Sequence, residues 1–142
     1  MASKIGIEES NRFINEAFPG NQSRTQITHL AEGEATVRLV ADDTHLRPGN
    51  YISGPTQMSL ADTAAYFAVM SLIGLEPMTV TSNLNINFLR PCIGTVVVAH
   101  GEVMKIGAAL AVIEVDIRIE GAEKASSHAI VTYAIPRKEA RA

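Results

Sequence analysis

The hydrophobic pattern of the chain contains one long apolar block followed by a series of alternating segments. Between Pro55 and Gly74 most residues are apolar or small, and no polar stripe recurs at helical spacing. A helix that is apolar all round is buried inside a protein rather than laid on its surface. The pattern therefore predicts a long central helix that begins near Pro55, since proline is favoured in a first helical turn.

Alternating apolar and polar residues make up most of the chain after this block. Leu84, Ile86 and Phe88 alternate with three asparagines. Successive side chains of a strand point to opposite faces, so a period of two is typical of half-buried strands. With the segments that precede the block, strands are expected at residues 25–30, 34–40, 84–88, 95–105, 109–119 and 126–135.

The remaining segments complete the predicted fold. Phe13, Ile14 and Phe18 have approximate helical spacing within a short helix at about residues 8–18, and a polar loop is expected at residues 42–50. Short turns between consecutive strands indicate antiparallel hairpins. A curled antiparallel sheet and the long helix both need an apolar partner, so we expect an α+β protein in which the sheet wraps the helix.

Length and composition narrow the class of protein. The chain has 142 residues, 46% hydrophobic residues and a net charge of -3, which suits a single globular domain over residues 1–142. No basic run is present, so nucleic-acid binding is not expected. Asp62 interrupts the apolar block, which argues against a membrane span. No signal peptide is visible and the only cysteine is Cys92, so we expect a cytoplasmic protein.

Neither a metal site nor a reactive cysteine is predicted. Cys92 follows Pro91 and has no cysteine or histidine at metal-ligand spacing. The four histidines show no ligand spacing either. The sequence therefore predicts no metal and no cofactor.

Asp62 is the candidate for chemistry. From Pro48 to Leu75 it is the only residue with a formally charged side chain. An ionised carboxylate loses its solvation on burial, and aspartate is almost never fully buried without a partner. A lone carboxylate on an apolar helix therefore indicates a group that faces a cleft and does chemistry there. The alternative is an aspartate that caps a neighbouring loop or pairs with a distant arginine.

Two motifs at a characteristic separation resemble those of the hotdog-fold thioesterases. They are Ser53-Gly54-Pro55 with Leu60-Ala61-Asp62-Thr63-Ala64, and Leu84-Asn85-Ile86-Asn87-Phe88-Leu89-Arg90-Pro91. Within that fold the chain looks like the phenylacetate-degradation (PaaI-type) acyl-CoA thioesterases, over about residues 25–135. The resemblance implies a dimer whose two helices are wrapped by one joined sheet, often paired into a tetramer, with active sites at the subunit interface.

The resemblance also assigns catalytic roles. The family aspartate falls on Asp62, which in relatives acts as general base or as nucleophile on the thioester. The glycine at the start of the helix falls on Gly54 and offers its N–H to the thioester carbonyl oxygen. The strand serine or threonine that helps to position water in some relatives falls on Thr81. Both routes for Asp62 remain open.

The chain departs from the family pattern before the helix. The common His-Gly-Gly reads Ser53-Gly54-Pro55 here, so one backbone N–H is lost but that of Gly54 is kept. An asparagine that holds water or substrate in some relatives falls on Arg47, and Asn50 is the nearest alternative. Substrate or CoA contacts are expected from Asn50, Ser53, Asn87, Arg90 and Lys105. For Arg90 and Lys105 the role would be CoA phosphate binding, against the alternative of solvated surface charges.

The sequence thus predicts an acyl-CoA thioesterase that converts an aryl- or medium-chain acyl-CoA into a free acid and CoA. One alternative is a non-catalytic acyl-CoA-binding protein on the same fold. The other is a hotdog dehydratase or hydratase, but the Asp and His five positions apart that the hydratases use are missing here. The pattern leaves open the acyl group and the choice between dimer and tetramer.

Overall fold

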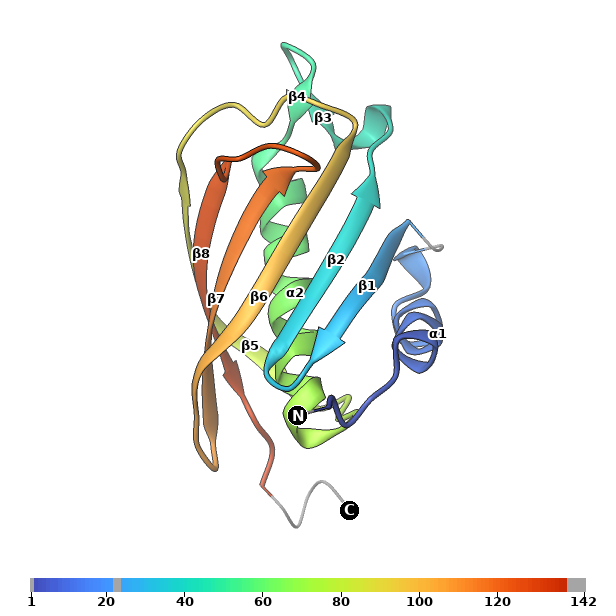
Figure 1. Ribbon diagram of the computed structural model, residues 1–142, viewed down its shortest axis with the longest axis vertical. Helices are drawn as coiled ribbons and strands as arrows, with labels where there is room; N and C mark the ends of the chain where they lie inside the picture. The colour runs from blue at the N-terminus through green and yellow to red at the C-terminus, as the bar shows by residue number, and fades with distance from the viewer. Residues whose placement is uncertain (1, 22–23, 138–142) are drawn as a thin grey trace.

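A six-stranded antiparallel sheet curls around one long helix (Figure 1). The computed structural model describes residues 2–21 and 24–137. Helix α2 spans Gly54–Ile73, and the sheet consists of β1 (Thr25–Ala31), β2 (Glu34–Val40), β5 (Val80–Phe88), β6 (Val96–Ile106), β7 (Leu110–Ile119) and β8 (Ser127–Ala134). The predicted α+β architecture, with a curled sheet around a central helix, is confirmed.

Smaller elements surround this core. They are α1 (Ile7–Ala17), the 3-10 helices η1 (Pro19–Asn21) and η2 (Asp43–His45), and the short strands β3 (Leu46–Arg47) and β4 (Tyr51–Ile52). Helix α1 lies where the pattern predicts a helix at residues 8–18. The β3–β4 hairpin falls in and just after the segment predicted as a plain polar loop, because two-residue strands are too short to show alternation.

The strand order places the segment after α2 at an edge of the sheet. The order is β1-β2-β6-β7-β8-β5, with every neighbouring pair antiparallel. The register lines up inward-facing small and apolar residues: Ala35, Gly101, Val115 and Ala129 are direct partners on four adjacent strands. Strand β5 therefore pairs with β8 on one side and has no strand beyond it in the described chain.

Helix α2 packs very closely on this inner face. Ala61, Ala64, Ala65 and Ala68 are completely buried. A Cβ added at Gly101 on β6 would lie only 3.2 Å from the carbonyl oxygen of Ala64. Small residues on both elements thus let the two backbones approach. The side of α2 that carries Asp62 faces away from this contact and stays half-buried.

The start and end of α2 are fixed by local hydrogen bonds. At the N-terminus the Ser53 hydroxyl accepts the Thr56 N–H at 3.2 Å, as an N-cap residue does. At the C-terminus the Gly74 N–H donates to the Met70 carbonyl at 2.8 Å, with Gly74 at a φ of 88°.

Across residues 2–21 and 24–137, no helix combines the length and hydropathy that a membrane crossing requires.

The two edges of the sheet differ. Helix α1 covers the β1 edge, where the Asn11 Nδ2 donates to the Ile27 carbonyl at 3.0 Å and the Ile27 N–H donates to Asn11 Oδ1 at 2.8 Å. The β5 edge has no such cover in the described chain. Val80 and Phe88, at its two ends, are 54% and 51% exposed. The molecule therefore presents one protected edge and one open edge.

Candidate active site

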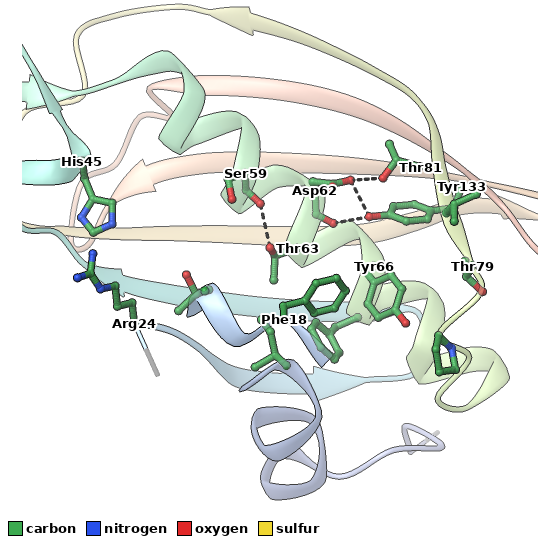
Figure 2. A pocket seen from close by; sticks show the side chains of 16 residues that line it. Phe18, Arg24, His45, Ser59, Asp62, Thr63, Tyr66, Thr79, Thr81 and Tyr133 are labelled. Atoms are coloured by element: carbon green, nitrogen blue, oxygen red, sulfur yellow. Dashed lines mark hydrogen bonds between the residues drawn. The ribbon is translucent and has the colours of Figure 1, made fainter. Parts of the chain in front are cut away.

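The carboxylate of Asp62 is held by two hydroxyl groups. Thr81 Oγ1 donates to Asp62 Oδ1 at 2.7 Å, and Tyr133 Oη lies 2.6 Å from the same oxygen and 2.9 Å from the Asp62 carbonyl oxygen (Figure 2). No described arginine or lysine forms an ion pair with this carboxylate. Asp62 is thus neither a loop cap nor half of a distant ion pair, but a half-buried carboxylate beside a pocket.

The sheet register brings the two hydroxyls together. Thr81 on β5 and Tyr133 on β8 are direct cross-strand partners, and an irregularity in the pairing follows between Thr81 and Asn83. On β8 the alternation that buries Ala129 and Val131 also turns Tyr133 inward, where it is 3% exposed. The pairing of β5 with β8 therefore places both hydroxyl donors next to Oδ1 of Asp62 on α2.

The state of the Tyr133 phenol follows from its surroundings. Burial raises its pKa well above the usual range, and the negative charge of the Asp62 carboxylate raises it further. The raised pKa keeps the phenol protonated at neutral pH. Tyr133 is therefore suited to donate a hydrogen bond to Asp62 rather than to act as a base.

A pocket of about 620 Å³ runs along α2 beside this cluster. Its lining includes Ile14, Phe18, Gly20, Arg24, Thr25, His45, Ser59, Asp62, Thr63, Tyr66, Phe67, Pro77, Thr79, Val80, Thr81 and Tyr133. Ser59, Asp62 and Tyr66 stand on successive turns of the helix, and a rise of 1.5 Å per residue puts the first and last about 10 Å apart. Asp62 is therefore near the middle of an elongated pocket.

One end of the pocket is aromatic. The Tyr66 ring lies 5.2 Å from that of Phe67, 6.3 Å from Phe13 and 6.5 Å from Phe18. Tyr66 Oη donates to the Glu76 carbonyl at 3.0 Å. Burial, followed by the nearby Glu76 carboxylate, raises the pKa of Tyr66 to about 12. This end thus offers an apolar surface of fixed, uncharged rings.

The same end contains a polar atom without a partner. Thr79 is 3% exposed, and its Oγ1 is the only buried side-chain oxygen or nitrogen in the described residues for which the structure shows no hydrogen bond. A buried hydroxyl in that state loses its hydration without compensation. It therefore lowers the stability of the fold at this position.

The opposite end of the pocket is polar. Arg24 Nη1 lies 3.2 Å from Asp42 Oδ2, and the His45 Nδ1 accepts the Asp42 N–H at 2.9 Å. Hydrogen bonds from Thr44, with smaller contributions from Arg24 and His45, hold the pKa of Asp42 below its ordinary value. Sequence reasoning missed Arg24 and His45, since neither belongs to a motif and only folding brings them to the pocket.

Gly54 stands apart from Asp62 within one chain. It is the first residue of α2, where backbone N–H groups have no intrahelical partner. A Cβ at Gly54 would lie 3.3 Å from Cζ of Phe88, so the end of β5 covers this glycine. The eight residues from Gly54 to Asp62 span about 12 Å along the helix. Within one chain, the two predicted catalytic groups are therefore too far apart to share one small reacting group.

Two of the predicted binding residues precede Gly54 in the chain. The Ser53 hydroxyl caps α2 and lies 2.8 Å from the Thr56 hydroxyl. Asn50 is exposed in the β3–β4 turn at a φ of 60°, and its N–H donates to the Arg47 carbonyl at 3.0 Å. Neither lines the pocket beside Asp62. Their contact with substrate stays a prediction.

The other three predicted binding residues do not line this pocket. Asn87 is paired with His128 and shares with it the sheet face opposite α2. Arg90 lies in the connection after β5, where its Nη1 donates to the Ala125 carbonyl. Lys105 lies near the other end of β6 and is exposed. A single chain therefore does not gather Asn87, Arg90 and Lys105 at the Asp62 pocket, and their binding roles stay predictions.

One group in the described chain has metal-ligand geometry, although the sequence predicts no metal site. Glu34, His100 and Glu102 offer ligand atoms within 4.8 Å of one another. His100 Nε2 lies 3.2 Å from Glu34 Oε1 and 3.3 Å from Glu102 Oε1, distances at which hydrogen bonds also form. The group lies on the sheet face opposite α2, away from the Asp62 pocket.

Comparison with known proteins agrees with this fold. The sequence profile of the thioesterase superfamily matches residues 49–126. Ta0293 of Thermoplasma acidophilum, a candidate esterase, is 28% identical over 113 residues, which cover 79% of this chain and 83% of that protein.

Solved structures show the same likeness. A candidate thioesterase of Silicibacter sp. TM1040 superposes with a TM-score of 0.87 at 33% identity, covering 96% of this chain and 95% of its own. The PaaI protein of the E. coli phenylacetic acid degradation operon superposes with a TM-score of 0.77 at 23% identity, covering 92% and 96%. The profile match spans more than half of the chain. This chain therefore belongs to the thioesterase superfamily and is a thioester hydrolase with the hotdog fold.

Proposed function

We propose that this protein hydrolyses an aryl- or medium-chain acyl-CoA, with Asp62 as the general base at a site completed by a second copy of the chain. The observation that carries the proposal is the Asp62 carboxylate, oriented by two hydroxyl donors beside an elongated pocket. The aromatic end of that pocket suits an apolar acyl group. One core of buried residues connects the elements, which supports a single domain over residues 1–142.

The hydrogen bonds favour the general-base route. Thr81 and Tyr133 both bond Oδ1 of Asp62, which leaves Oδ2 to accept a proton from water. The water oxygen forms a bond to the thioester carbonyl carbon as Asp62 takes the proton. The C–S bond then breaks, and the proton passes to the departing CoA thiolate. Thr81 and Tyr133 act as positioning residues for the carboxylate in this scheme.

The oxyanion needs a donor that one protomer does not bring to Asp62. A donor sits about 3 Å from the oxyanion, and the base reaches the carbonyl carbon through one water. Both groups must therefore lie within roughly 7 Å of each other, whereas about 12 Å of helix separates Gly54 from Asp62. We assign the oxyanion contact to Gly54 of the partner subunit.

The open edge of the sheet supplies a way to bring the second copy in. In each protomer Thr81 and Asp62 lie at the start of β5, and Phe88 and Gly54 lie at its end. Antiparallel pairing of two β5 strands about a two-fold axis would set the start of one strand against the end of the other. Asp62 of one protomer would then face the partner subunit's Gly54. A dimer is the smallest assembly that completes the site, and pairing of dimers into a tetramer is compatible with it.

The first test is release of free thiol from a panel of aryl- and straight-chain acyl-CoAs by wild type and Asp62→Asn. We expect the wild type to hydrolyse at least one substrate. The rate should fall at least about a hundredfold in Asp62→Asn, since proton transfer by a positioned base contributes that much. Binding of acyl-CoA without turnover by the wild type would contradict the proposal and favour a binding protein. A variant that kept most of its kcat would remove Asp62 from the mechanism.

The second test asks whether one site uses two chains. Gly54→Pro removes the N–H at a position where proline suits a helix, while Gly54→Ala adds bulk and keeps the N–H, so their difference measures the N–H itself. Inactive Asp62→Asn and Gly54→Pro chains are refolded together. Random pairing makes half of the dimers mixed, each with one intact site, so about a quarter of wild-type activity should return. No recovery in verified mixed dimers would place both groups in one chain.

A further inference from the structure

We infer that Phe18, at the end of α1, closes the acyl end of the pocket and limits the size of the acyl group. The inference rests on the proposed acyl-CoA hydrolysis. Phe18 lines the same pocket as Asp62, and Figure 2 shows it on the α1 side, across from the strand residues Thr81 and Tyr133. It is 53% exposed, so a large apolar surface is available to a bound acyl group.

The direction of the acyl group follows from the helix. Asp62 marks the reacting carbonyl, and Tyr66 is one turn further along the same side of α2. Beyond Asp62 the lining becomes aromatic, whereas toward Ser59 it becomes polar and ends at Arg24 and His45. An apolar acyl chain therefore extends from Asp62 past Tyr66, and Phe18 is the ring that it meets on the α1 side.

The Phe18 ring, which forms the wall at the acyl end of the pocket, is held in place by contacts with neighbouring residues. The Phe18 ring meets Tyr66 edge-on, with 6.5 Å between ring centroids, and Phe13 in the same way at 6.4 Å. The Phe18 N–H donates to the Ile14 carbonyl at 3.0 Å. Helix α1 is in turn fixed to β1 by the two hydrogen bonds between Asn11 and Ile27. A ring anchored in this way limits length rather than yielding to a longer chain.

The wall comes from a part of the chain outside the family match. The thioesterase superfamily profile begins at residue 49, after α1 and Phe18. Catalytic and acyl-limiting residues are therefore contributed by different segments. Selectivity can change through Phe18 without altering the segment that carries Asp62.

The test compares Phe18→Leu with Phe13→Leu across straight-chain acyl-CoAs from butanoyl to dodecanoyl. Both variants lose one aromatic ring from α1 or its end, and both rings contact Tyr66, but only Phe18 lines the pocket. In Phe18→Leu the ratio of kcat/KM for the longest to the shortest substrates should rise about tenfold or more, as expected for added space in a hydrophobic pocket. Phe18→Trp should shift the ratio the other way, and Phe13→Leu should leave it unchanged.

The outcomes separate this inference from the proposed function. If the wild type hydrolyses acyl-CoA and Phe18→Leu has the same chain-length profile and the same Tm as the wild type, the inference is overturned. The proposed function then still stands. An equal shift in Phe13→Leu would also overturn it, because the effect would then come from general loosening of α1. No hydrolysis by the wild type would instead contradict the proposed function itself.

Discussion

The Tyr133 phenolic oxygen lies 2.6 Å from Oδ1 of Asp62, on the same carboxylate oxygen that Thr81 bonds at 2.7 Å. Two donors on one oxygen fix the plane of the carboxylate, and neither of the two hydroxyls bonds its other oxygen. Hydrogen bonds to a charged group are about twice as strong as those between neutral groups. Both donors are strand residues, so the sheet sets the orientation of the Asp62 carboxylate.

Tyr133→Phe should lower kcat about ten- to a hundredfold. The change keeps the ring and removes one charge-assisted hydrogen bond worth about 1.5–3 kcal/mol. The KM for acyl-CoA should change little, since the hydroxyl contacts the base rather than the substrate. Steady-state kinetics beside a thermal melt separate this effect from unfolding. A folded variant with wild-type kcat would show that Thr81 alone orients the carboxylate.

Thr81→Val and Thr81→Ser form a matched pair. Valine keeps the shape of threonine but removes the hydroxyl, so kcat should fall about tenfold or more. Serine keeps the donor to Asp62 and should restore most of the activity. Similar losses in both variants would mean that the hydroxyl alone is not sufficient and that the Thr81 methyl group is needed as well. A Thr81→Val protein with wild-type kcat would remove the Thr81 hydroxyl from the mechanism.

Most of the fold follows from short-range sequence patterns. The apolar block from Pro55 to Gly74 indicates α2 because most of its residues are apolar or small, and the strands appear as alternations of two. Asp62 stands out for the same reason, as one charge in an apolar helix. These features depend on residues within a few positions of each other, and such patterns are visible without the structure.

The partners of Asp62 depend on long-range register instead. Tyr133 is 71 residues away in the sequence, and alternation shows only that it faces inward, not which helix residue it meets. Arg24, directly before β1, and His45, in η2, reach the pocket from separate segments and carry no local signal. Gly54 and Asp62 follow from motifs, but the distance between them has meaning only once the helix geometry and the open β5 edge are known.

Tyr66→Phe should reduce the loss of stability at alkaline pH. The folded pKa of Tyr66, about 12, is above its ordinary value of 10.0. Above the ordinary pKa the unfolded chain releases this proton while the folded protein keeps it, so rising pH favours unfolding until the folded pKa is passed. The variant lacks this contribution, so its free energy of unfolding should fall less between neutral pH and about pH 11.

Urea titrations of both proteins at the two pH values measure that difference. At neutral pH the Tyr66→Phe protein should be about 1 kcal/mol less stable, since the bond to the Glu76 carbonyl is lost. The lost hydrogen bond destabilises the variant, whereas the missing Tyr66 ionisation spares it a loss at high pH. The difference in free energy of unfolding between variant and wild type should therefore narrow as pH rises. A difference that widened would contradict the raised pKa of Tyr66.

Thr79→Val should stabilise the protein by about 1 kcal/mol. Valine has nearly the shape of threonine and removes a buried hydroxyl that has no partner in the described chain. Ser127→Ala is the matched contrast, because its buried hydroxyl donates to Gln57 Oε1 at 2.7 Å, and its loss should destabilise. Urea unfolding at neutral pH measures both changes. A Thr79→Val protein less stable than wild type would show that this hydroxyl has a partner.

Asn11→Ala should destabilise the protein by about 1–3 kcal/mol, because the Asn11 amide satisfies both backbone groups of Ile27 at the β1 edge. Glu16→Ala, an exposed position on α1, is the control and should have little effect. Amide hydrogen exchange gives the sharper measurement, since the Ile27 N–H donates to Asn11 and should exchange faster once Asn11 is gone. An edge freed in this way also becomes available to other chains. Concentration-dependent association of Asn11→Ala through β1, absent in Glu16→Ala, would show that α1 keeps pairing confined to the β5 edge. Unchanged Ile27 exchange would mean that other contacts protect this edge.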